Sequence, residues 1–167
     1  LPLPVRPGDG AVPTAVRGLA ALGFRGANVT VPHKAAVAAA LDTMTPEARA
    51  LGAVNTLVFE PDLPGTDGVT IIGHNTDGDG FLAALDDAGC GPAAGAKVVV
   101  VGAGGAARAI VYALLSVGVG RVWIFNRSAP RLEKMMIDLD WLAHGRLTTR
   151  ALDQDMLVDT VREADLL

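Results

Sequence analysis

A glycine-rich segment, GAGGAA, joins a run of four valines to an apolar helical pattern. Gly102, Gly104 and Ala107 follow the spacing G-x-G-x-x-G/A, which places bare backbone N–H groups at the start of a helix. These groups and the helix dipole can bind a pyrophosphate, and a side chain at Gly102 or Gly104 would block its approach. The pattern predicts a dinucleotide site, although a tight turn that binds no nucleotide has the same sequence signature.

The residues after the next predicted strand indicate which dinucleotide would bind. NAD sites generally end this strand with Asp or Glu, which accepts a hydrogen bond from the ribose 2′-hydroxyl. Here the strand ends in Asn126 and Arg127, with Arg131 four residues further on. A carboxylate would repel a 2′-phosphate, whereas guanidinium groups would bind it. We therefore expect NADP, although Arg131 also fits an ordinary exposed charge on a helix.

The segment NVTVPHK in the first half of the chain combines polar side chains with a lysine. Asn28 and Thr30 alternate with valines, so the two polar residues share one face of a predicted strand. Lys34 follows in the predicted first turn of a helix, where the dipole disfavours a cation. Ligands of open α/β sheets gather beyond the carboxyl ends of the strands, so Thr30 and Lys34 are expected beside a substrate. An exposed helical lysine is the alternative.

Two further segments concentrate polar side chains at predicted strand ends. GAVNT carries Asn55, and GHNTDGDG carries Asn75, Thr76 and Asp77 just before a helix. Asp77 could act in catalysis or only cap the helix, and Asn55 could bind a ligand or be only a polar group at a strand edge.

Hydrophobic periodicity and turn residues predict the elements that position these groups. The first half is expected to hold a strand over 1–5, a helix that begins near Pro13, a strand up to residue 31, helices over 32–41 and 45–52, and paired strands over 54–59 and 69–72. The second half then alternates strands and helices from Lys97 onward, which is typical of a parallel sheet.

This pattern predicts an α/β protein with two α/β domains, both partial. We expect a substrate domain over 1–80, a connecting helix and linker over 81–92, and a Rossmann-like NADP-binding domain over 93–167. The chain opens within a predicted strand and stops just after an apolar run has begun, so we expect a fragment of a longer protein.

Composition narrows the classes of partner. The 167 residues carry a net charge of -4 and few aromatic residues, which argues against nucleic acid as the main partner. No apolar run reaches the length of a membrane span, and the start lacks the features of a signal peptide, so a cytoplasmic location is expected. With a single cysteine we expect no metal site. A small-molecule substrate is the remaining expectation.

NVTVPHK, GAVNT, NTDGDGF, GAGGAARA and NRSAPR, in this order, resemble the shikimate dehydrogenase family, whose members reduce 3-dehydroshikimate to shikimate with NADPH. The similarity extends over essentially the whole chain. It implies that Lys34 is the catalytic acid/base and Asp77 its partner. It also implies a set of substrate-binding residues, Asn28, Thr30 and Asn55, and a set of NADP-binding residues, Gly102, Ala103, Gly104, Gly105, Ala106, Asn126, Arg127 and Arg131.

The resemblance is incomplete. Family members begin with a Ser-x-Ser loop that binds the substrate carboxylate, and they end with a Tyr-bearing loop, a Gln and further helices, which this sequence lacks. His33 and His74 lie beside motif residues and are expected to be non-catalytic. A quinate/shikimate dehydrogenase that uses NAD, and a non-catalytic dinucleotide-binding module, remain as alternatives.

Overall fold

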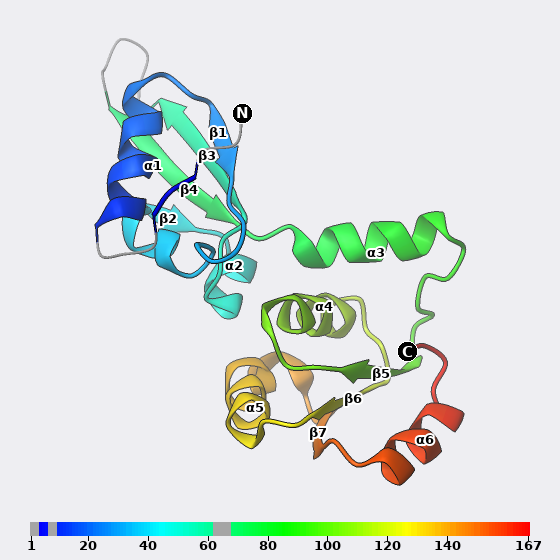
Figure 1. Ribbon diagram of the computed structural model, residues 1–167. Coiled ribbons are helices and arrows are strands. Elements are labelled where there is room, and N and C mark those ends of the chain that lie inside the picture. Colours follow the sequence, from blue (N-terminus) through cyan, green and yellow to red (C-terminus); the bar gives the residue numbers. More distant parts are fainter. Residues whose placement is uncertain (1–3, 7–9, 62–67) are drawn as a thin grey trace. The chain divides into compact units, whose positions relative to one another are not determined.

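The computed structural model describes residues 4–6, 10–61 and 68–167, and the chain divides into two compact units between Thr76 and Asp77 (Figure 1). The domain boundaries predicted from the sequence, at residues 80 and 92, lie later than this division. The reason is that the helix beginning at Asp77 packs against a helix of the second unit. Each unit is described separately below.

The first unit is built on a four-stranded sheet in the order β1-β3-β4-β2 (Figure 1). Its strands are β1 (Gly26–Asn28), β2 (Thr43–Met44), β3 (Thr56–Pro61) and β4 (Val69–His74). β3 pairs antiparallel with both β1 and β4, and β2 lies parallel to β4. The predicted pairing of the strands near 54–59 and 69–72 is confirmed, and the residues that join them, 62–67, lie outside the described ranges.

Three short helices accompany this sheet: α1 (Ala11–Ala21), the 3-10 helix η1 (Ala36–Ala40) and α2 (Pro46–Leu51). The predicted boundaries of α2 are confirmed. The Thr45 hydroxyl accepts from the Ala48 N–H at 3.3 Å at the start of the helix, and Gly52 ends it with a φ of 61°. The sheet and helices enclose one apolar core, to which Val12, Val16, Val37, Ala40, Ala48, Val54, Leu57, Phe59 and Ile71 contribute.

The segment around Lys34 differs from its predicted structure. β1 ends at Asn28 rather than at residue 31, and in place of the helix predicted over 32–41 there are turns followed by η1. The Val54 N–H donates to the carbonyl of Lys34 at 2.8 Å, so this carbonyl serves a contact between distant segments and not a helical ladder. Of the strand predicted over 1–5, residues 1–3 lie outside the described ranges, and Pro4 and Val5 are not in a strand.

The second unit is an alternation of helices and parallel strands. It comprises α3 (Asp77–Asp87), β5 (Lys97–Val101), α4 (Gly105–Ser116), β6 (Arg121–Asn126), α5 (Ala129–Ala143), β7 (Leu147–Ala151) and α6 (Gln154–Arg162). The strands pair parallel in the order β5-β6-β7, which confirms the parallel sheet that the sequence predicted without an order. None of the helices within the described ranges is both long and apolar enough to cross a membrane.

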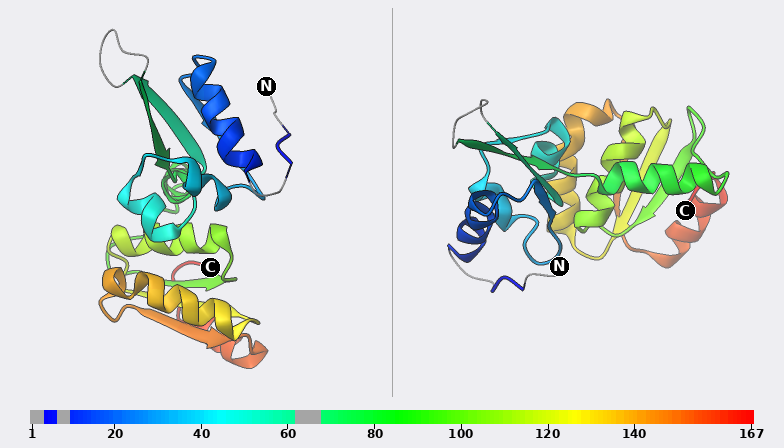
Figure 2. Two further views of the ribbon diagram at one scale, coloured as in Figure 1. Left: turned by 90° about the vertical axis from the view of Figure 1, so that its left-hand side faces the viewer. Right: turned by 90° about the horizontal axis from the view of Figure 1, so that it is seen from above.

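Alternate side chains of these strands point to opposite faces of the sheet, and each face is covered by helices (Figures 1 and 2). Val98, Val122 and Ile124 pack with residues of α4 and α5. Val99, Trp123 and Phe125 form a smaller cluster with residues of α6. The second unit is therefore a three-layer α/β arrangement whose strand ends lie at one edge of the sheet.

α4, which follows the glycine-rich turn, is held in place on two sides. On α3, a Cβ at Gly78 would lie 2.8 Å from the Ala109 carbonyl oxygen, so only glycine permits this close approach of the helices. On α5, Asp138 pairs with Arg108 of α4 and with Lys134 at 3.1 Å. Burial raises the pKa of the Asp138 carboxyl, but hydrogen bonds and attraction from Arg108 and Lys134 outweigh it and leave the pKa below its usual value.

Arg146 joins the carboxyl ends of α4 and α5. Its guanidinium donates to the carbonyl of Leu115 at 3.1 Å and to that of Val119 at 3.0 Å, and also to the carbonyls of Leu142 at 2.9 Å and Ala143 at 3.1 Å. A cation is favoured at both helix ends, because each carries the negative pole of a helix dipole.

We expect Arg146→Met to lower the free energy of unfolding by about 2 kcal/mol, since several partly buried carbonyls lose a charged donor while the apolar stem is kept. Urea unfolding of the variant and the parent protein measures this difference. Arg17→Met, which changes an exposed arginine of α1, is the control and should cost less than about 0.5 kcal/mol. Equal effects of the two substitutions would contradict the capping role.

Candidate functional site

In the second unit, the predicted cofactor residues meet at one edge of the sheet. Val101 of β5 and Phe125 of β6 are partners in register, and the Gly102 N–H donates to the Phe125 carbonyl at 2.7 Å. The glycine-rich turn, 102–106, therefore begins beside the residues that follow β6, 126–131. The carboxyl ends of neighbouring parallel strands form the usual ligand-binding edge of such sheets.

The glycines of the turn leave room for a ligand. Gly102 has a φ of +121°, a conformation that side chains rarely adopt, so the backbone itself requires glycine there. Gly104 has a φ of -87°, and a Cβ at Gly104 or Gly105 would meet no atom within 4 Å. The protein's own packing thus gives no reason for glycine at 104 and 105. Open space at the amino end of α4 is what the close approach of a pyrophosphate requires.

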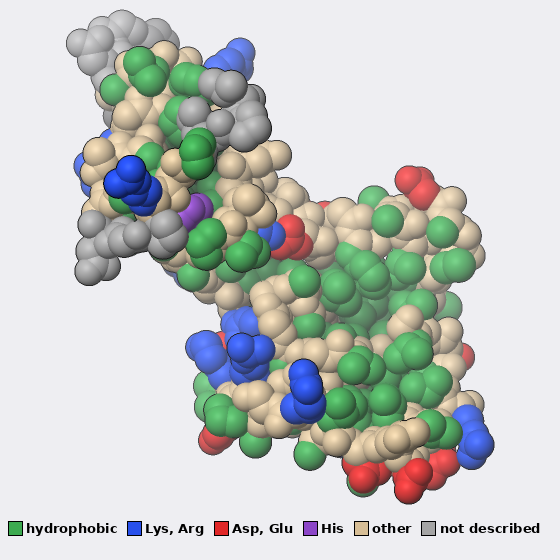
Figure 3. All heavy atoms as spheres, viewed as in Figure 1, with side chains coloured by type: hydrophobic (Ala, Val, Ile, Leu, Met, Phe, Trp, Pro, Cys, Tyr) green, Lys and Arg blue, Asp and Glu red, His purple; other side chains and the backbone are tan. Residues whose placement is uncertain are grey.

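Two arginines stand next to this turn. Arg127 and Arg131 are exposed, and in the described part of the chain neither guanidinium forms an ion pair or a hydrogen bond. Asn126 is half-buried, and its side-chain nitrogen donates to the Ser128 carbonyl at 3.2 Å. Figure 3 shows Lys and Arg side chains gathered over the α4 and α5 side of the second unit, and acidic side chains near α6. This arrangement fits a phosphate group beside the end of β6.

In the first unit, three polar side chains form a row across the sheet. Asn28 of β1 lies opposite Thr56 of β3, which lies opposite His74 of β4. Directly opposed residues of antiparallel strands point to the same face, and the neighbouring Leu57 points to the apolar core. The row therefore lies on the face away from that core, at the end of the sheet where β1 and β4 terminate and β3 begins.

Asn55 lies at the same end of the sheet and is held at both its backbone and its side chain. Its N–H donates to the His74 carbonyl at 3.0 Å, and its carbonyl accepts from Val29 at 2.7 Å. Its side-chain oxygen accepts from the Thr56 hydroxyl at 2.9 Å and from the Thr76 N–H at 3.1 Å. The sequence predicted Asn55 as a site residue but did not single out Thr56, although GAVNT contains it.

Asn75 supports this arrangement from below the surface. It is buried, and its side-chain nitrogen donates to the Ala53 carbonyl at 3.0 Å, which ties the segment after β4 to the segment before β3. A buried amide with a fixed partner is a structural element of the site rather than a group exposed to a ligand.

Lys34 is brought to this end of the sheet by its backbone. Its carbonyl accepts from Val54, the residue before Asn55, and its side chain is half-buried. The prediction that Lys34 lies in the first turn of a helix is wrong, so the dipole argument for a catalytic role no longer applies. Thr30 is exposed in the preceding loop, where its carbonyl accepts from the His33 N–H at 2.9 Å.

Asp77 follows Thr76 in the chain and is the first residue of α3, in the second unit. Its half-buried carboxylate lies in the first turn, where the helix dipole favours a negative charge. A stabilising role in α3 is therefore compatible with its position. The pairing of Asp77 with Lys34 joins residues of different units and stays a prediction.

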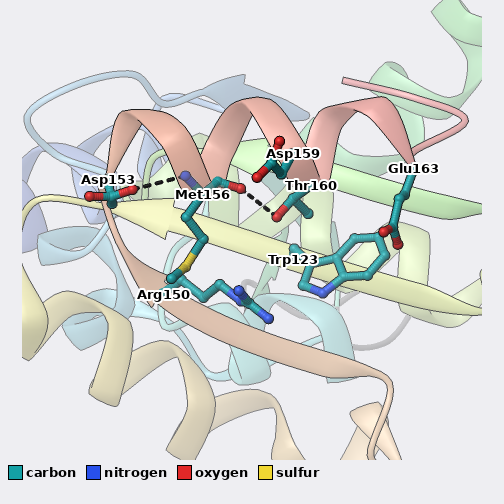
Figure 4. A pocket seen from close by; sticks show the side chains of 7 residues that line it. All are labelled: Trp123, Arg150, Asp153, Met156, Asp159, Thr160 and Glu163. Atoms are coloured by element: carbon teal, nitrogen blue, oxygen red, sulfur yellow. Dashed lines mark hydrogen bonds between the residues drawn. The ribbon is translucent and has the colours of Figure 1, made fainter.

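A pocket of about 480 Å³ lies elsewhere, between α6 and the strands β6 and β7 (Figure 4). Its polar lining residues largely stabilise α6: Asp153 accepts from the Met156 N–H at 2.8 Å, and Thr160 donates to the Met156 carbonyl at 2.7 Å. Trp123 and Arg150 line the pocket from the sheet. None of the residues predicted from the sequence to bind cofactor or substrate lines it.

Comparison with known proteins finds matches in both units of the chain. Residues 4–57 match the family described as "Shikimate dehydrogenase substrate binding domain", and residues 85–167 match "Shikimate / quinate 5-dehydrogenase". The chain belongs to the shikimate dehydrogenase family. The resemblance seen in the sequence motifs is thereby confirmed, as is the two-domain α/β fold that it implied.

Individual shikimate dehydrogenase relatives show how far the similarity extends. The shikimate dehydrogenase (NADP(+)) of Geobacter metallireducens is 43% identical over 169 residues, which cover 100% of this chain and 56% of the relative. The shikimate 5-dehydrogenase of Listeria monocytogenes, solved with shikimate and NAD, has a TM-score of 0.83 at 32% identity and matches 95% of this chain and 54% of its own. The quinate dehydrogenase of Corynebacterium glutamicum, solved with NAD, has a TM-score of 0.77 at 30% identity. The match covers 95% of this chain and 55% of the quinate dehydrogenase chain.

These figures mean that the chain spans about half the length of the relatives that it matches.

Proposed function

We propose that this protein catalyses the NADP-dependent, reversible reduction of 3-dehydroshikimate to shikimate. The observation that carries the proposal is that this member of the shikimate dehydrogenase family has a candidate site in each of its two units. One is the polar cluster of Asn28, Thr30, Lys34 and Asn55 at one end of the first sheet, and the other is the open glycine-rich turn beside Arg127 in the second unit. Small-molecule recognition needs such convergent polar groups.

The residues of the first unit supply binding and proton transfer. NADPH, when bound, would supply a hydride for the ketone carbon, and the oxygen that gains charge would then need a proton. The Lys34 ammonium donates this proton from Nζ, and in the reverse direction the neutral amine takes it from the hydroxyl. Asn28, Thr30 and Asn55 hold the hydroxyl groups of the ring, which fixes the reacting carbon. Asp77 orients the Lys34 ammonium.

The residues of the second unit fit NADP. The N–H groups at the start of α4 and the space beside Gly104 accommodate the pyrophosphate, with Gly102, Ala103, Gly105 and Ala106 forming the rest of the turn. Arg127 and Arg131 bind the 2′-phosphate, and Asn126 shapes the loop beside it. The name of the Geobacter metallireducens relative supports the same cofactor.

We expect Gly104→Ala to weaken NADPH binding by at least about 10-fold, because the added methyl occupies space that the pyrophosphate needs. The free energy of unfolding should change by less than about 1 kcal/mol, since the backbone at Gly104 suits alanine. Fluorescence titration and urea unfolding measure the two quantities. Gly18→Ala in α1, another position with open space, is the control and should leave binding unchanged.

Oxidation of quinate with NAD⁺ is the second candidate, favoured by the family description that names quinate and by the solved quinate dehydrogenase. The absence of a carboxylate at Asn126 and Arg127, directly after β6, argues for NADP. A non-catalytic dinucleotide-binding module is the third candidate.

Steady-state oxidation of shikimate and quinate, each with NADP⁺ and NAD⁺, separates these functions. The proposed function requires shikimate with NADP⁺ to give the highest kcat/KM. Turnover of quinate with NAD⁺ would establish the second candidate, and NADPH binding without turnover of either substrate would establish the third. We also propose a cytoplasmic location, as the apolar runs and the first residues of the sequence predicted.

A further inference from the structure

The structure assigns to Thr56 the role of a positioning residue: its hydroxyl fixes the orientation of the Asn55 amide, so that the amide nitrogen is the group directed to substrate. This inference rests on the proposed function, in which Asn55 binds a substrate hydroxyl. Neither the sequence motifs nor the relatives assign a role to Thr56.

The orientation of the Asn55 amide follows from its donors. A backbone N–H can only donate, so the amide atom 3.1 Å from the Thr76 nitrogen must be the oxygen. The Thr56 hydroxyl lies 2.9 Å from the same oxygen and donates to it. Thr76 adds its own hydroxyl, which is 3.3 Å from the amide oxygen and 3.2 Å from the amide nitrogen. The contact from the Thr56 hydroxyl to the amide oxygen is shorter than the contact from the Thr76 hydroxyl.

Thr56 is itself rigidly placed. It begins β3 and is paired in register with Asn28 on one side and with His74 on the other. The next residue, Leu57, is anchored in the apolar core. A β-branched residue in a central strand has few accessible rotamers, so its hydroxyl is a fixed donor. The flexible amide of Asn55 is therefore oriented by a group with little freedom of its own.

This orientation has a consequence for specificity. With the amide oxygen accepting from Thr56 and Thr76, Asn55 offers a ligand its nitrogen as a donor, and this nitrogen also donates to the Thr76 hydroxyl at 3.2 Å. The substrate atom at this position must then be an acceptor, such as a hydroxyl oxygen. Orientation before binding removes the cost of ordering the amide in the complex, which favours affinity.

The test compares Thr56→Val, which keeps the shape and removes the hydroxyl, with Thr56→Ser, which keeps the hydroxyl. In Thr56→Val we expect KM for shikimate to rise about 3- to 10-fold, in line with one lost hydrogen bond, and kcat and the NADPH dissociation constant to change less than about 2-fold. Thr56→Ser should restore KM. A merely structural role of Thr56 would lower the melting temperature and would leave KM unaffected.

A second measurement does not depend on which substrate is turned over. The NMR order parameter of the Asn55 side-chain NH₂ group, identified by the loss of its signal in Asn55→Asp, should fall in Thr56→Val and recover in Thr56→Ser. An unchanged order parameter in Thr56→Val overturns the inference. If the order parameter falls in Thr56→Val but KM stays unchanged for every substrate that the protein turns over, the link between Thr56 and substrate binding is also overturned. If shikimate is not turned over by the parent protein, the proposed function fails, and the order parameter still decides the role of Thr56.

Discussion

Replacing Lys34 with Ala is expected to lower kcat by about 10²- to 10⁴-fold, the usual effect of losing a general acid, while KM for shikimate changes only a few-fold. The reason is that water would then have to take the proton from the shikimate hydroxyl in the oxidation, and would have to supply it in the reduction. The measurement is steady-state shikimate oxidation by the protein expressed from its whole reading frame. Lys97→Ala, at an exposed position of β5, is the control and should leave kcat unchanged.

A large rise in KM with kcat unchanged would show that Lys34 only binds substrate. The companion variant Asp77→Asn separates two roles of the carboxylate. If Asp77 orients the Lys34 ammonium, this substitution should also reduce kcat strongly without unfolding the protein. If Asp77 only stabilises the first turn of α3, the amide should be tolerated and turnover should stay near that of the parent.

The second large effect is expected at the cofactor site. Arg127→Ala should weaken NADPH binding about 10- to 150-fold, because a charge-assisted hydrogen bond to phosphate contributes about 1.5 to 3 kcal/mol. NADH binding should hardly change, since NADH lacks the 2′-phosphate. Dissociation constants of both cofactors, measured by fluorescence titration, give a ratio that isolates this contact from general damage to the fold.

Arg131, in α5, is expected to retain part of the preference for NADPH in the Arg127→Ala variant. The double variant Arg127→Ala/Arg131→Ala should lose nearly all of it. Arg121→Ala, at the opposite end of β6, is the control and should leave both dissociation constants unchanged. Equal binding of NADH and NADPH by the parent protein would show that the arginines do not bind the phosphate, and would favour the NAD-using alternative.

The nucleotide-binding half was largely predictable from the sequence. A run of valines, a glycine-rich turn and an amphipathic helix are local signals, and in a parallel sheet the chain order of such units also determines which strand ends lie together. The neighbouring positions of 102–106 and 126–131 therefore followed from residue types and spacing, and the structure confirms this arrangement. Arg146 was not predicted, because its four carbonyl partners come from two helix ends that are distant in sequence.

The substrate-binding half depended more on tertiary structure. The sequence alone identified Asn28, Thr30, Lys34 and Asn55 as polar residues near strand ends, and it correctly placed α2, β3 and β4. It predicted a helix over 32–41, and the alanines of this segment favour one. In the structure, however, the Val54 N–H donates to the Lys34 carbonyl, and only a short 3-10 helix follows. Local propensity could not reveal this competing long-range hydrogen bond. For the same reason, only the folded sheet shows that Thr56 and Thr76, 20 residues apart in their numbering, meet at the one amide oxygen of Asn55.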